Sequence, residues 1–147
     1  MFSLDFSGSG QSDGDYISLG WYEREDVQTI TEYLRGTGTV STIALWGISM
    51  GAATALLHAD RDHSIAGIVC DSGFASLKQL ARELAKKHTK IPNFLLNVGI
   101  KAINSSVKSR AHFDLNKLNP IDNLDKAYIP ALFAHAEGDD FIPPDHS

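Results

Sequence analysis

The stretch Trp46-Gly47-Ile48-Ser49-Met50-Gly51 contains the pattern G-x-S-x-G. Residues 39–46 form a compact β-branched run that predicts a buried strand leading into it. Residues 49–59 are rich in small side chains and predict a helix leading out of it. Because short patterns recur by chance, this placement between a strand and a helix matters more than the five letters. It predicts a sharp turn that exposes one side chain at the carboxyl edge of a sheet.

The chemistry of this turn indicates that Ser49 is a nucleophile. Gly47 and Gly51 lack the Cβ atoms that we expect to collide in so tight a turn. Ser49 would stand at the start of a helix, where the backbone N–H of Met50 faces any oxyanion that forms beside the serine. The simpler alternative is an ordinary serine N-cap after a glycine turn. The strand–turn–helix context favours the nucleophile.

Alternating strand and helix patterns extend outward from the turn. Apolar runs predict strands at residues 2–6, 65–70 and 129–136, and helical spacing of apolar residues predicts an amphipathic helix at residues 21–35. Strands that alternate with helices indicate a doubly wound, mostly parallel sheet. Because the strands are continuously apolar, we expect helices on both faces of this sheet. The sequence therefore predicts one α/β domain over residues 1–147.

Residues 78–117 interrupt the alternation with two consecutive helical stretches and no strand between them. This segment has nine basic and two acidic residues, a net charge of +7 that leaves −12 for the rest of the chain. One apolar stripe runs along its second helical stretch, formed by Leu96, Ile100, Ile103 and Val107. We expect a helical lid insertion at about residues 75–118. Its charge indicates either solvated helices or a basic cap that attracts an anionic substrate or membrane headgroups.

Composition excludes several classes of protein. The 147 residues carry a net charge of −5, which argues against a general nucleic-acid binder. The single cysteine, Cys70, excludes an internal disulfide framework and a multi-thiolate metal site, and the histidines lie singly rather than at ligand spacings. We expect no metal and no cofactor. Since the sequence has neither a signal peptide nor a spanning segment, we expect a soluble domain and favour a cytoplasmic location.

Three motifs resemble the α/β-hydrolase superfamily. The first is the turn at residues 47–51, which is similar to the nucleophile elbow of that superfamily. The second is DFSGSGQS at residues 5–12, which resembles the D-x-x-G-x-G-x-S turn after the fourth strand of many members. The third is AHAEGDDFIP at residues 134–143, which resembles the H-G-x-x-D-x-x-V-P segment after the seventh strand. The most similar branch is serine aminopeptidase-like and acyl-thioesterase-like, with a short helical lid.

This resemblance implies a partial α/β-hydrolase domain with Ser49 as nucleophile and Asp139 as the acid of a catalytic triad. Asp139 stands three residues before Ile142-Pro143, as the acid of the family does before its apolar–proline pair. Asp71 is a second candidate for the acid, because some hydrolases carry the acid at the end of the preceding strand. It is less favoured than Asp139. Its alternative role is a hydrogen bond to the turn that follows it. Asp140 is interpreted as a loop charge.

The base of the triad is the missing part. In this superfamily the histidine follows the acid, and only His146 lies beyond Asp139, in what reads as the same loop. Five other histidines have no better claim: His58, His63, His88, His112 and His135. The loop that normally supplies a second oxyanion donor is also missing. We therefore expect residues 1–147 to belong to a longer protein and to be inactive by themselves.

The sequence thus predicts a serine hydrolase that cleaves a carboxylic ester or thioester through an acyl-serine intermediate, with an amide as a further substrate. Apolar residues in the lid, such as Phe94 and Leu95, favour an acyl group over a short polar peptide. The expected partner is a small-molecule acyl substrate that is anionic or associated with a membrane, and not a nucleic acid. The alternative is a non-catalytic hydrolase-like protein that serves in binding or scaffolding.

Overall fold

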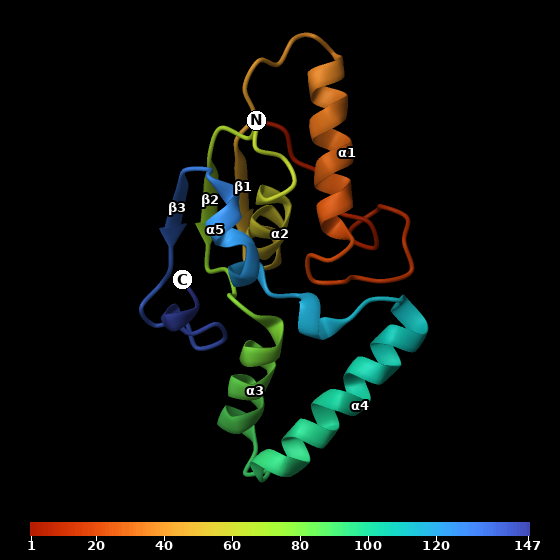
Figure 1. The fold of residues 1–147 in the computed structure, drawn as a ribbon, viewed down its shortest axis with the longest axis vertical. Helices are drawn as coiled ribbons and strands as arrows, with labels where there is room; N and C mark the ends of the chain where they lie inside the picture. Colours follow the sequence, from red (N-terminus) through yellow and green to blue (C-terminus); the bar gives the residue numbers. More distant parts are fainter.

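A three-stranded parallel sheet lies at the centre of the fold (Figure 1). The computed structural model describes residues 1–147, with the side chain of Asn123 excepted. The strands are β1 (Leu45–Ile48), β2 (Ile68–Asp71) and β3 (Ala131–Ala134), in the order β1-β2-β3. Their last residues lie in one row of the register, so all three strands end at the same edge. The predicted α/β fold with a parallel sheet is confirmed.

Helices alternate with these strands along the chain. α1 (Glu23–Gly36) precedes β1, and α2 (Met50–Ala59) connects β1 to β2. Three helices lie between β2 and β3: α3 (Leu77–His88), α4 (Asn93–Ala111) and α5 (Leu124–Ala127). The described chain also has three short 3-10 turns: η1 (Leu115–Lys117), η2 (Pro120–Asn123) and η3 (Pro144–His146). None of the described helices is both long and apolar enough to cross a membrane.

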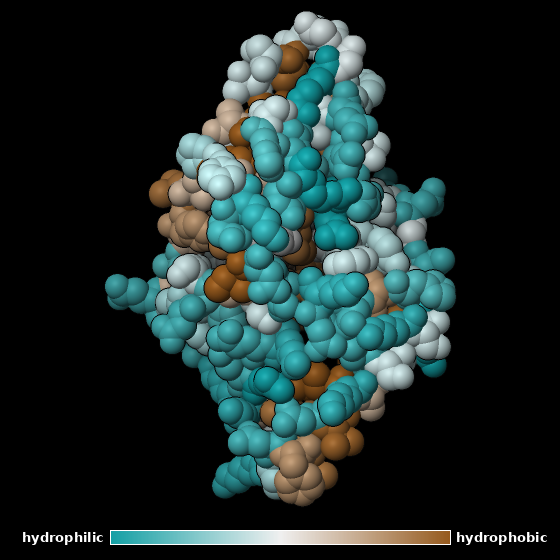
Figure 2. Space-filling view, viewed as in Figure 1, coloured by the Kyte–Doolittle hydropathy of each residue, from teal (hydrophilic) through white to brown (hydrophobic). Residues whose placement is uncertain are grey.

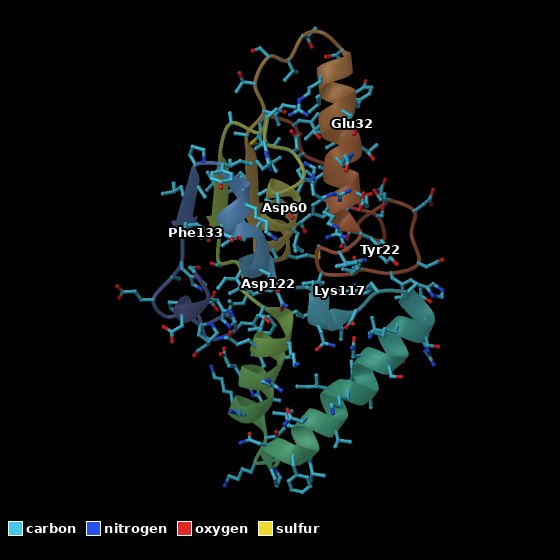
Figure 3. All side chains as sticks on the ribbon, viewed as in Figure 1. Tyr22, Glu32, Asp60, Lys117, Asp122 and Phe133 are labelled. Carbon is cyan, nitrogen blue, oxygen red and sulfur yellow. The ribbon has the colours of Figure 1, made fainter. Side chains whose placement is uncertain are left out.

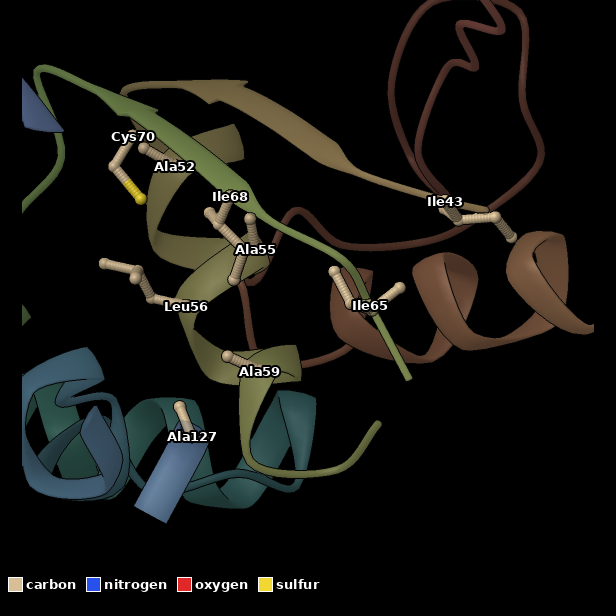
Figure 4. Close-up of a cluster of buried hydrophobic side chains, with 9 residues drawn as sticks. All are labelled: Ile43, Ala52, Ala55, Leu56, Ala59, Ile65, Ile68, Cys70 and Ala127. Atoms are coloured by element: carbon tan, nitrogen blue, oxygen red, sulfur yellow. The ribbon is translucent and has the colours of Figure 1, made fainter. Parts of the chain in front are cut away.

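The hydrophobic core lies between the sheet and α2 (Figure 4). Ala52 of α2 and Cys70 of β2 are almost completely buried there. α1 packs against α2, so the sheet, α2 and α1 form successive layers (Figure 1). The buried side chains of this cluster are Ile43, Ala52, Ala55, Leu56, Ala59, Ile65, Ile68, Cys70 and Ala127. The small residues of α2 allow the helix to pack closely against the sheet.

The opposite face of the sheet is uncovered. Trp46, Val69 and Leu132 align across the three strands and therefore point to the same face. Trp46 is 71% exposed and Leu132 is 64% exposed. We expected helices on both faces, but in residues 1–147 the helices cover only the face that carries Ile68 and Cys70. The apolar pattern of the strands is present on both faces, and the second face is open to solvent.

The strand predicted at residues 2–6 does not form. This segment is irregular, its first residues are exposed, and no described strand pairs with it. A strand requires a ladder of hydrogen bonds to a neighbour, so an apolar run alone does not make one. The other strands are shorter than predicted. Residues 39–44 lie outside β1, although Ile43 is buried and its carbonyl accepts a hydrogen bond from Ala66 N–H.

α3 and α4 form a V below the carboxyl edge of the sheet (Figure 1), and we call residues 77–111 the α3–α4 insertion. A second apolar cluster joins its base to α2, formed by Ala53, Leu57, Phe74, Leu80, Ala111, Phe113, Leu118 and Ile142. At the end of α4, Phe113 stacks on Trp21 with ring centroids 6.1 Å apart. Tyr22, at the start of α1 (Figure 3), donates its hydroxyl hydrogen to Ala111 O at 2.7 Å. Both ends of the insertion are therefore anchored, and the turn between its helices lies far from the core.

The apolar stripe predicted on the second helix is only partly buried. Leu96, Ile100 and Val107 are half-buried, whereas Ile103 is 59% exposed. Further apolar side chains near the turn of the V are also exposed, and they form the apolar patch at the lower end of the molecule in Figure 2. α4 therefore packs against its neighbours less completely than a core helix does.

Gly47 determines how closely β1 and α2 approach each other. A Cβ atom at this position would overlap the Gly51 carbonyl group and the backbone nitrogen of Ala52. The expected need for glycine at position 47 is confirmed. The same expectation is wrong for Gly51, because a Cβ atom there has no described atom within 4 Å. Gly51 supplies the backbone that Gly47 contacts, and its own missing side chain relieves no collision.

The two glycines therefore make a matched pair of variants. Gly47→Ala forces α2 away from β1, and we expect it to lower the free energy of unfolding by about 3 kcal/mol. Gly51→Ala meets open space within a helix, where alanine is preferred, and we expect a stabilisation of up to about 1 kcal/mol. Urea denaturation followed by tryptophan fluorescence measures both. Equal effects at the two positions would contradict the proposed contact.

His58 is fully buried within α2. Among the described residues, neither of its ring nitrogens has a hydrogen-bond partner, and Asp62 Oδ2 lies 4.0 Å from Nε2. Burial lowers the pKa of His58 from its usual 6.5, although the Asp62 carboxylate opposes the shift. The folded chain therefore holds His58 neutral at a pH where the unfolded chain protonates it.

This difference in protonation makes stability depend on pH. The contribution of His58 is fully present above about pH 6.5, the pKa in the unfolded chain, and is lost as the pH falls toward the lower folded pKa. The slope reaches at most about 1.4 kcal/mol per pH unit. We expect His58→Leu to reduce the loss of stability between pH 7 and pH 5, measured by urea denaturation at both values. A variant that loses as much stability as the parent would show that His58 is not the titrating group.

Candidate active site

Ser49 occupies the turn between β1 and α2 with a left-handed backbone, φ 52° and ψ −114°. A residue other than glycine is strained in this conformation. The backbone N–H of Ser49 donates to Asp71 O at 2.8 Å, which extends the β1–β2 ladder into the turn. Its carbonyl accepts from Ala53 N–H at 3.1 Å at the start of α2. Hydrogen bonds on both sides therefore hold Ser49 in the strained conformation.

Ser49 does not act as an ordinary N-cap. A capping serine has an extended backbone, and its hydroxyl accepts a hydrogen bond from the first turn of the helix. Ser76 does this at the start of α3, where φ is −150° and the hydroxyl accepts from Gln79 N–H. Ser49 has the opposite sign of φ and makes no side-chain cap hydrogen bond. The helix therefore does not use the Ser49 hydroxyl.

Met50 begins α2 directly beside this hydroxyl. As the first residue of the helix, it has a backbone N–H without an intrahelical acceptor, and the positive end of the helix dipole lies at the same place. The Met50 carbonyl accepts a hydrogen bond from Thr54 Oγ1 at 2.7 Å, which holds the first turn of α2. This arrangement suits the stabilisation of negative charge on an atom bonded to Ser49.

Asp139 lies in the loop after β3, where backbone groups orient its carboxylate. Oδ1 accepts from the N–H groups of Phe141 and Ile142, both at 2.9 Å. Oδ2 lies 3.5 Å from Nε2 of His135. The Ile142 and Phe141 N–H groups lower the pKa of Asp139, and His135 adds to the shift. The carboxylate is therefore ionised near neutral pH and is held in one orientation.

The sheet brings the loops of Ser49 and Asp139 to one edge. Ile48 and Ala134 end β1 and β3 in the same register row, with Asp71 of β2 between them. Since neighbouring strands lie about 4.8 Å apart, the ends of β1 and β3 are separated by about 10 Å. That spacing leaves room for a third group between a serine after β1 and a carboxylate after β3.

The other two carboxylates at this edge have different partners. Asp71 Oδ1 accepts from Ser72 Oγ at 2.9 Å, the bond to the following turn that the sequence predicts as its alternative role. Asp140 is almost fully exposed and pairs with Lys87 Nζ at 2.8 Å. Asp140 is therefore a loop charge, as predicted, but one with a partner on α3.

Among the described histidines, none forms a hydrogen bond with Ser49. His63, His88 and His112 are exposed. His58 is buried and lies in the last turn of α2, at the opposite end of the helix from Ser49. The described residues also contain no group of three or more side chains that could hold a metal ion.

His135 braces the loop that carries Asp139. It follows β3 immediately, although the strand predicted at residues 129–136 includes it. Its Nε2 bonds to Ile142 O at 2.8 Å, and its Nδ1 bonds to the hydroxyl of Ser147. Both ring nitrogens of His135 are therefore engaged by groups of the chain that follows β3.

His146 ends η3, and its buried side chain lies against α3 and the residues just before it. Its Nδ1 accepts from Ala75 N–H at 3.2 Å, so Nε2 is the nitrogen that donates to Glu83 Oε2 at 2.9 Å. The Glu83 pKa is lowered by hydrogen bonds from Gln79 and His146. His146 is therefore a structural link, and neither ring nitrogen is left to accept a proton from a serine.

Sequence reasoning missed the link between the acid loop and α3. Glu83 and Lys87 lie one turn apart on this helix and bind His146 and Asp140. The four-residue spacing of Glu83 and Lys87 indicates a shared helix face. Their partners lie 63 and 53 residues away, and nothing local in the sequence identifies them.

Comparison with known proteins finds similarity in sequence and in structure. The profile of the serine aminopeptidase family, S33, matches residues 1–118. The uncharacterized protein YqkD of Bacillus subtilis (strain 168) is 32% identical over 143 residues. An esterase of Pyrococcus furiosus superimposes with a TM-score of 0.69 at 22% identity. A lipase-esterase related protein from Clostridium acetobutylicum has a TM-score of 0.65, also at 22% identity, so both structures support the fold alone.

These matches include nearly all of this chain but a smaller share of the relatives. The alignment takes in 95% of this chain and 46% of YqkD. For the Pyrococcus furiosus esterase the shares are 97% and 51%, and for the Clostridium acetobutylicum protein they are 98% and 66%. The chain therefore spans about half the length of the first relatives that it matches.

The strained turn at Ser49 can be tested without an activity assay. Glycine adopts positive φ without the steric penalty of a Cβ atom, whereas alanine retains the strain. We expect Ser49→Gly to have a free energy of unfolding about 1 kcal/mol higher than Ser49→Ala, after allowance for the greater freedom of glycine in the unfolded chain. Both variants lack the hydroxyl, so urea denaturation of the pair isolates the backbone. A glycine variant less stable than the alanine variant would contradict the strained turn.

Proposed function

Because the chain belongs to the serine aminopeptidase family of α/β-hydrolases, we propose that the protein is a serine hydrolase in which Ser49 is the nucleophile. The observation that carries this proposal is the left-handed backbone of Ser49 at the junction of β1 and α2. Strain of this kind is kept at functional sites, where it aims a side chain. The hydroxyl is also unused by the helix that it begins.

The proposed reaction is acyl transfer to Ser49. Its Oγ attacks the carbonyl carbon of the substrate while a base takes the hydroxyl proton, and the oxyanion accepts a hydrogen bond from Met50 N–H. The tetrahedral intermediate collapses, the leaving group takes the proton from the protonated base, and an acyl-serine remains. Water then attacks the acyl-serine with the same base, which releases the carboxylic acid and restores Ser49.

Asp139 is the proposed acid that orients the base. Its carboxylate is ionised and held by two backbone N–H groups, so it can stabilise an imidazolium without moving. We place the base on a histidine outside residues 1–147, because the described histidines near the acid, His135 and His146, already have partners on both ring nitrogens. Residues 1–147 would then supply the nucleophile and the acid and would be inactive alone.

The proposed substrate is a carboxylic ester or a thioester, with an amide as the further candidate. Exposed apolar side chains of the α3–α4 insertion, among them Phe94 and Leu95, favour an apolar acyl group. Among the similar structures are a Pyrococcus furiosus esterase and a Pyrococcus horikoshii acylaminoacyl peptidase, and the latter has 18% identity and a TM-score of 0.60. Ester and amide cleavage are therefore both found on this fold.

A second candidate function is binding or scaffolding without turnover. One observation favours it: the histidine nearest to the Asp139 carboxylate, His135, bonds to Ile142 O and Ser147 and not to Ser49. A protein in which no other histidine reaches the serine would retain the fold and lose most of the rate, since the members of a triad act as a unit.

A fluorophosphonate probe separates the two functions. We expect the full-length protein to be labelled at Ser49 and Ser49→Ala to remain unlabelled, because the probe reacts with an activated serine hydroxyl. Asp139→Asn is expected to lower kcat on p-nitrophenyl esters by about 10³–10⁴-fold, whereas Asp140→Asn, at the neighbouring loop charge, is expected to change it by less than about twofold. A series of p-nitrophenyl esters of increasing chain length then measures the preferred acyl group. Absence of labelling, or equal labelling of Ser49→Ala, would favour the non-catalytic alternative.

A further inference from the structure

A cavity of about 470 Å³ is lined by residues of α3, α4 and η1 within the α3–α4 insertion and at its base. Its walls come from α3, α4 and η1, three elements that contact one another without closing the V. Its volume is in the range of pockets that hold small molecules. The polar residues that line it are Lys78, Arg82, Asn97, Lys101, Asn104 and Asn116.

The cavity has three cationic side chains and no carboxylate in its lining. Lys78 and Arg82 lie one turn apart on α3, and Lys101 lies on α4. Among the described residues, none of the three forms an ion pair with an acidic side chain. Solvated helices usually offset such charges with acids at helical spacing. Here the positive charges converge from two helices on one space and remain uncompensated.

The carboxylate next to the cavity, Asp114, does not compensate this charge. It pairs with Lys108 at 2.7 Å and accepts hydrogen bonds from Asn104 and Asn116. Lys108 is the largest cause that lowers the pKa of Asp114, and the backbone N–H of Asn116 adds to it. Asp114 is therefore an anion already matched by its own lysine, and the three cations of the cavity are left for another group.

Of the three asparagines, Asn97 is the one whose amide N–H groups have no partner among the described residues, because Asn104 and Asn116 each donate to Asp114. Asn104 is only 8% exposed, and its oxygen accepts from Leu115 N–H at 2.9 Å. The Asn97 oxygen accepts from Nη2 of Arg82 at 2.7 Å, which holds the guanidinium between α3 and α4 and leaves the Asn97 amide N–H groups as donors. With these oxygens already used, the lining favours a ligand that accepts hydrogen bonds.

We propose that this cavity binds the phosphate group of a small organic phosphate. A phosphomonoester carries more negative charge than a carboxylate and has three acceptor oxygens, which suits three cations and the neighbouring Asn97 amide N–H groups. The space exceeds what the phosphate group alone requires, and Ile100 provides an apolar wall for the rest of the ligand. This site is separate from the proposed chemistry of Ser49, and it exists whether or not Ser49 is a nucleophile.

Binding is measured by calorimetry on full-length Ser49→Ala protein at constant ionic strength, with inorganic phosphate and glycerol 3-phosphate as probes. We expect saturable binding of glycerol 3-phosphate, and Arg82→Gln to weaken it by about tenfold or more, because a charge-assisted hydrogen bond is lost. Lys101→Gln tests the same cavity from α4 and keeps the test intact if the Arg82 variant fails to fold. The matched control, Lys126→Gln, removes one exposed charge from α5 and is expected to change binding by less than about twofold.

Vesicles of phosphatidylcholine with and without phosphatidate distinguish the source of the phosphate. Binding of glycerol 3-phosphate without vesicle binding supports a soluble ligand, and Arg82-dependent binding of phosphatidate vesicles supports a lipid headgroup in the same cavity. The proposal is overturned if neither probe nor phosphatidate binds, or if Lys126→Gln weakens binding as much as Arg82→Gln and Lys101→Gln do. Fluorophosphonate labelling of the parent protein is scored separately, so failure of one proposal leaves the other standing.

Discussion

The contact between Gly47 and the first turn of α2 is the constraint on which the rest of the structure depends. Because no side chain separates β1 from this turn, the chain reverses at Ser49 within a single residue and adopts a left-handed backbone. α2 then lies flat against the sheet through Ala52 and Ala55 and carries the second apolar cluster on its other side through Ala53 and Leu57. One close approach therefore determines the position of the serine and that of the helix shared by both cores.

The serine and the acid are supported by different parts of the molecule. Ser49 is held by the β1–β2 ladder and by α2, which belong to the buried layers. The loop of Asp139 is held by its own backbone and, through the buried His146, by Glu83 of α3, whereas the exposed Asp140–Lys87 pair adds little. A movement of α3 would therefore shift the acid loop while the serine stayed in place. The insertion therefore supports the loop of Asp139 through α3.

Most of the fold could be predicted from local patterns, whereas the contacts around the acid could not. The G-x-S-x-G turn, the alternation of strands and helices and the two-helix insertion follow from period and glycine placement. The strand at residues 2–6 was a wrong prediction, because an apolar run does not reveal whether a neighbour is present to complete the ladder. The prediction that a side chain at Gly51 would collide was also wrong. The pattern does not show that only Gly47 must lack a Cβ atom, because its neighbour in space is the backbone of Gly51. Ser49 and Asp139 lie in the segments that follow β1 and β3, so their positions follow from the order of the strands. The partners of His146 and Lys87 depend on tertiary contacts that have no local signal in the sequence.

The open face of the sheet makes concentration a variable in any study of these residues. Trp46 and Leu132 expose apolar surface that a parallel sheet normally buries. Leaving this surface in water costs about 25 cal/mol for each Å² relative to burying it. Anything that covers the face, including a second copy of the chain, binds the folded form alone and adds to its apparent stability. The unfolding midpoint of residues 1–147 would then rise with protein concentration, and the tryptophan on β1 would report the covering directly through its emission.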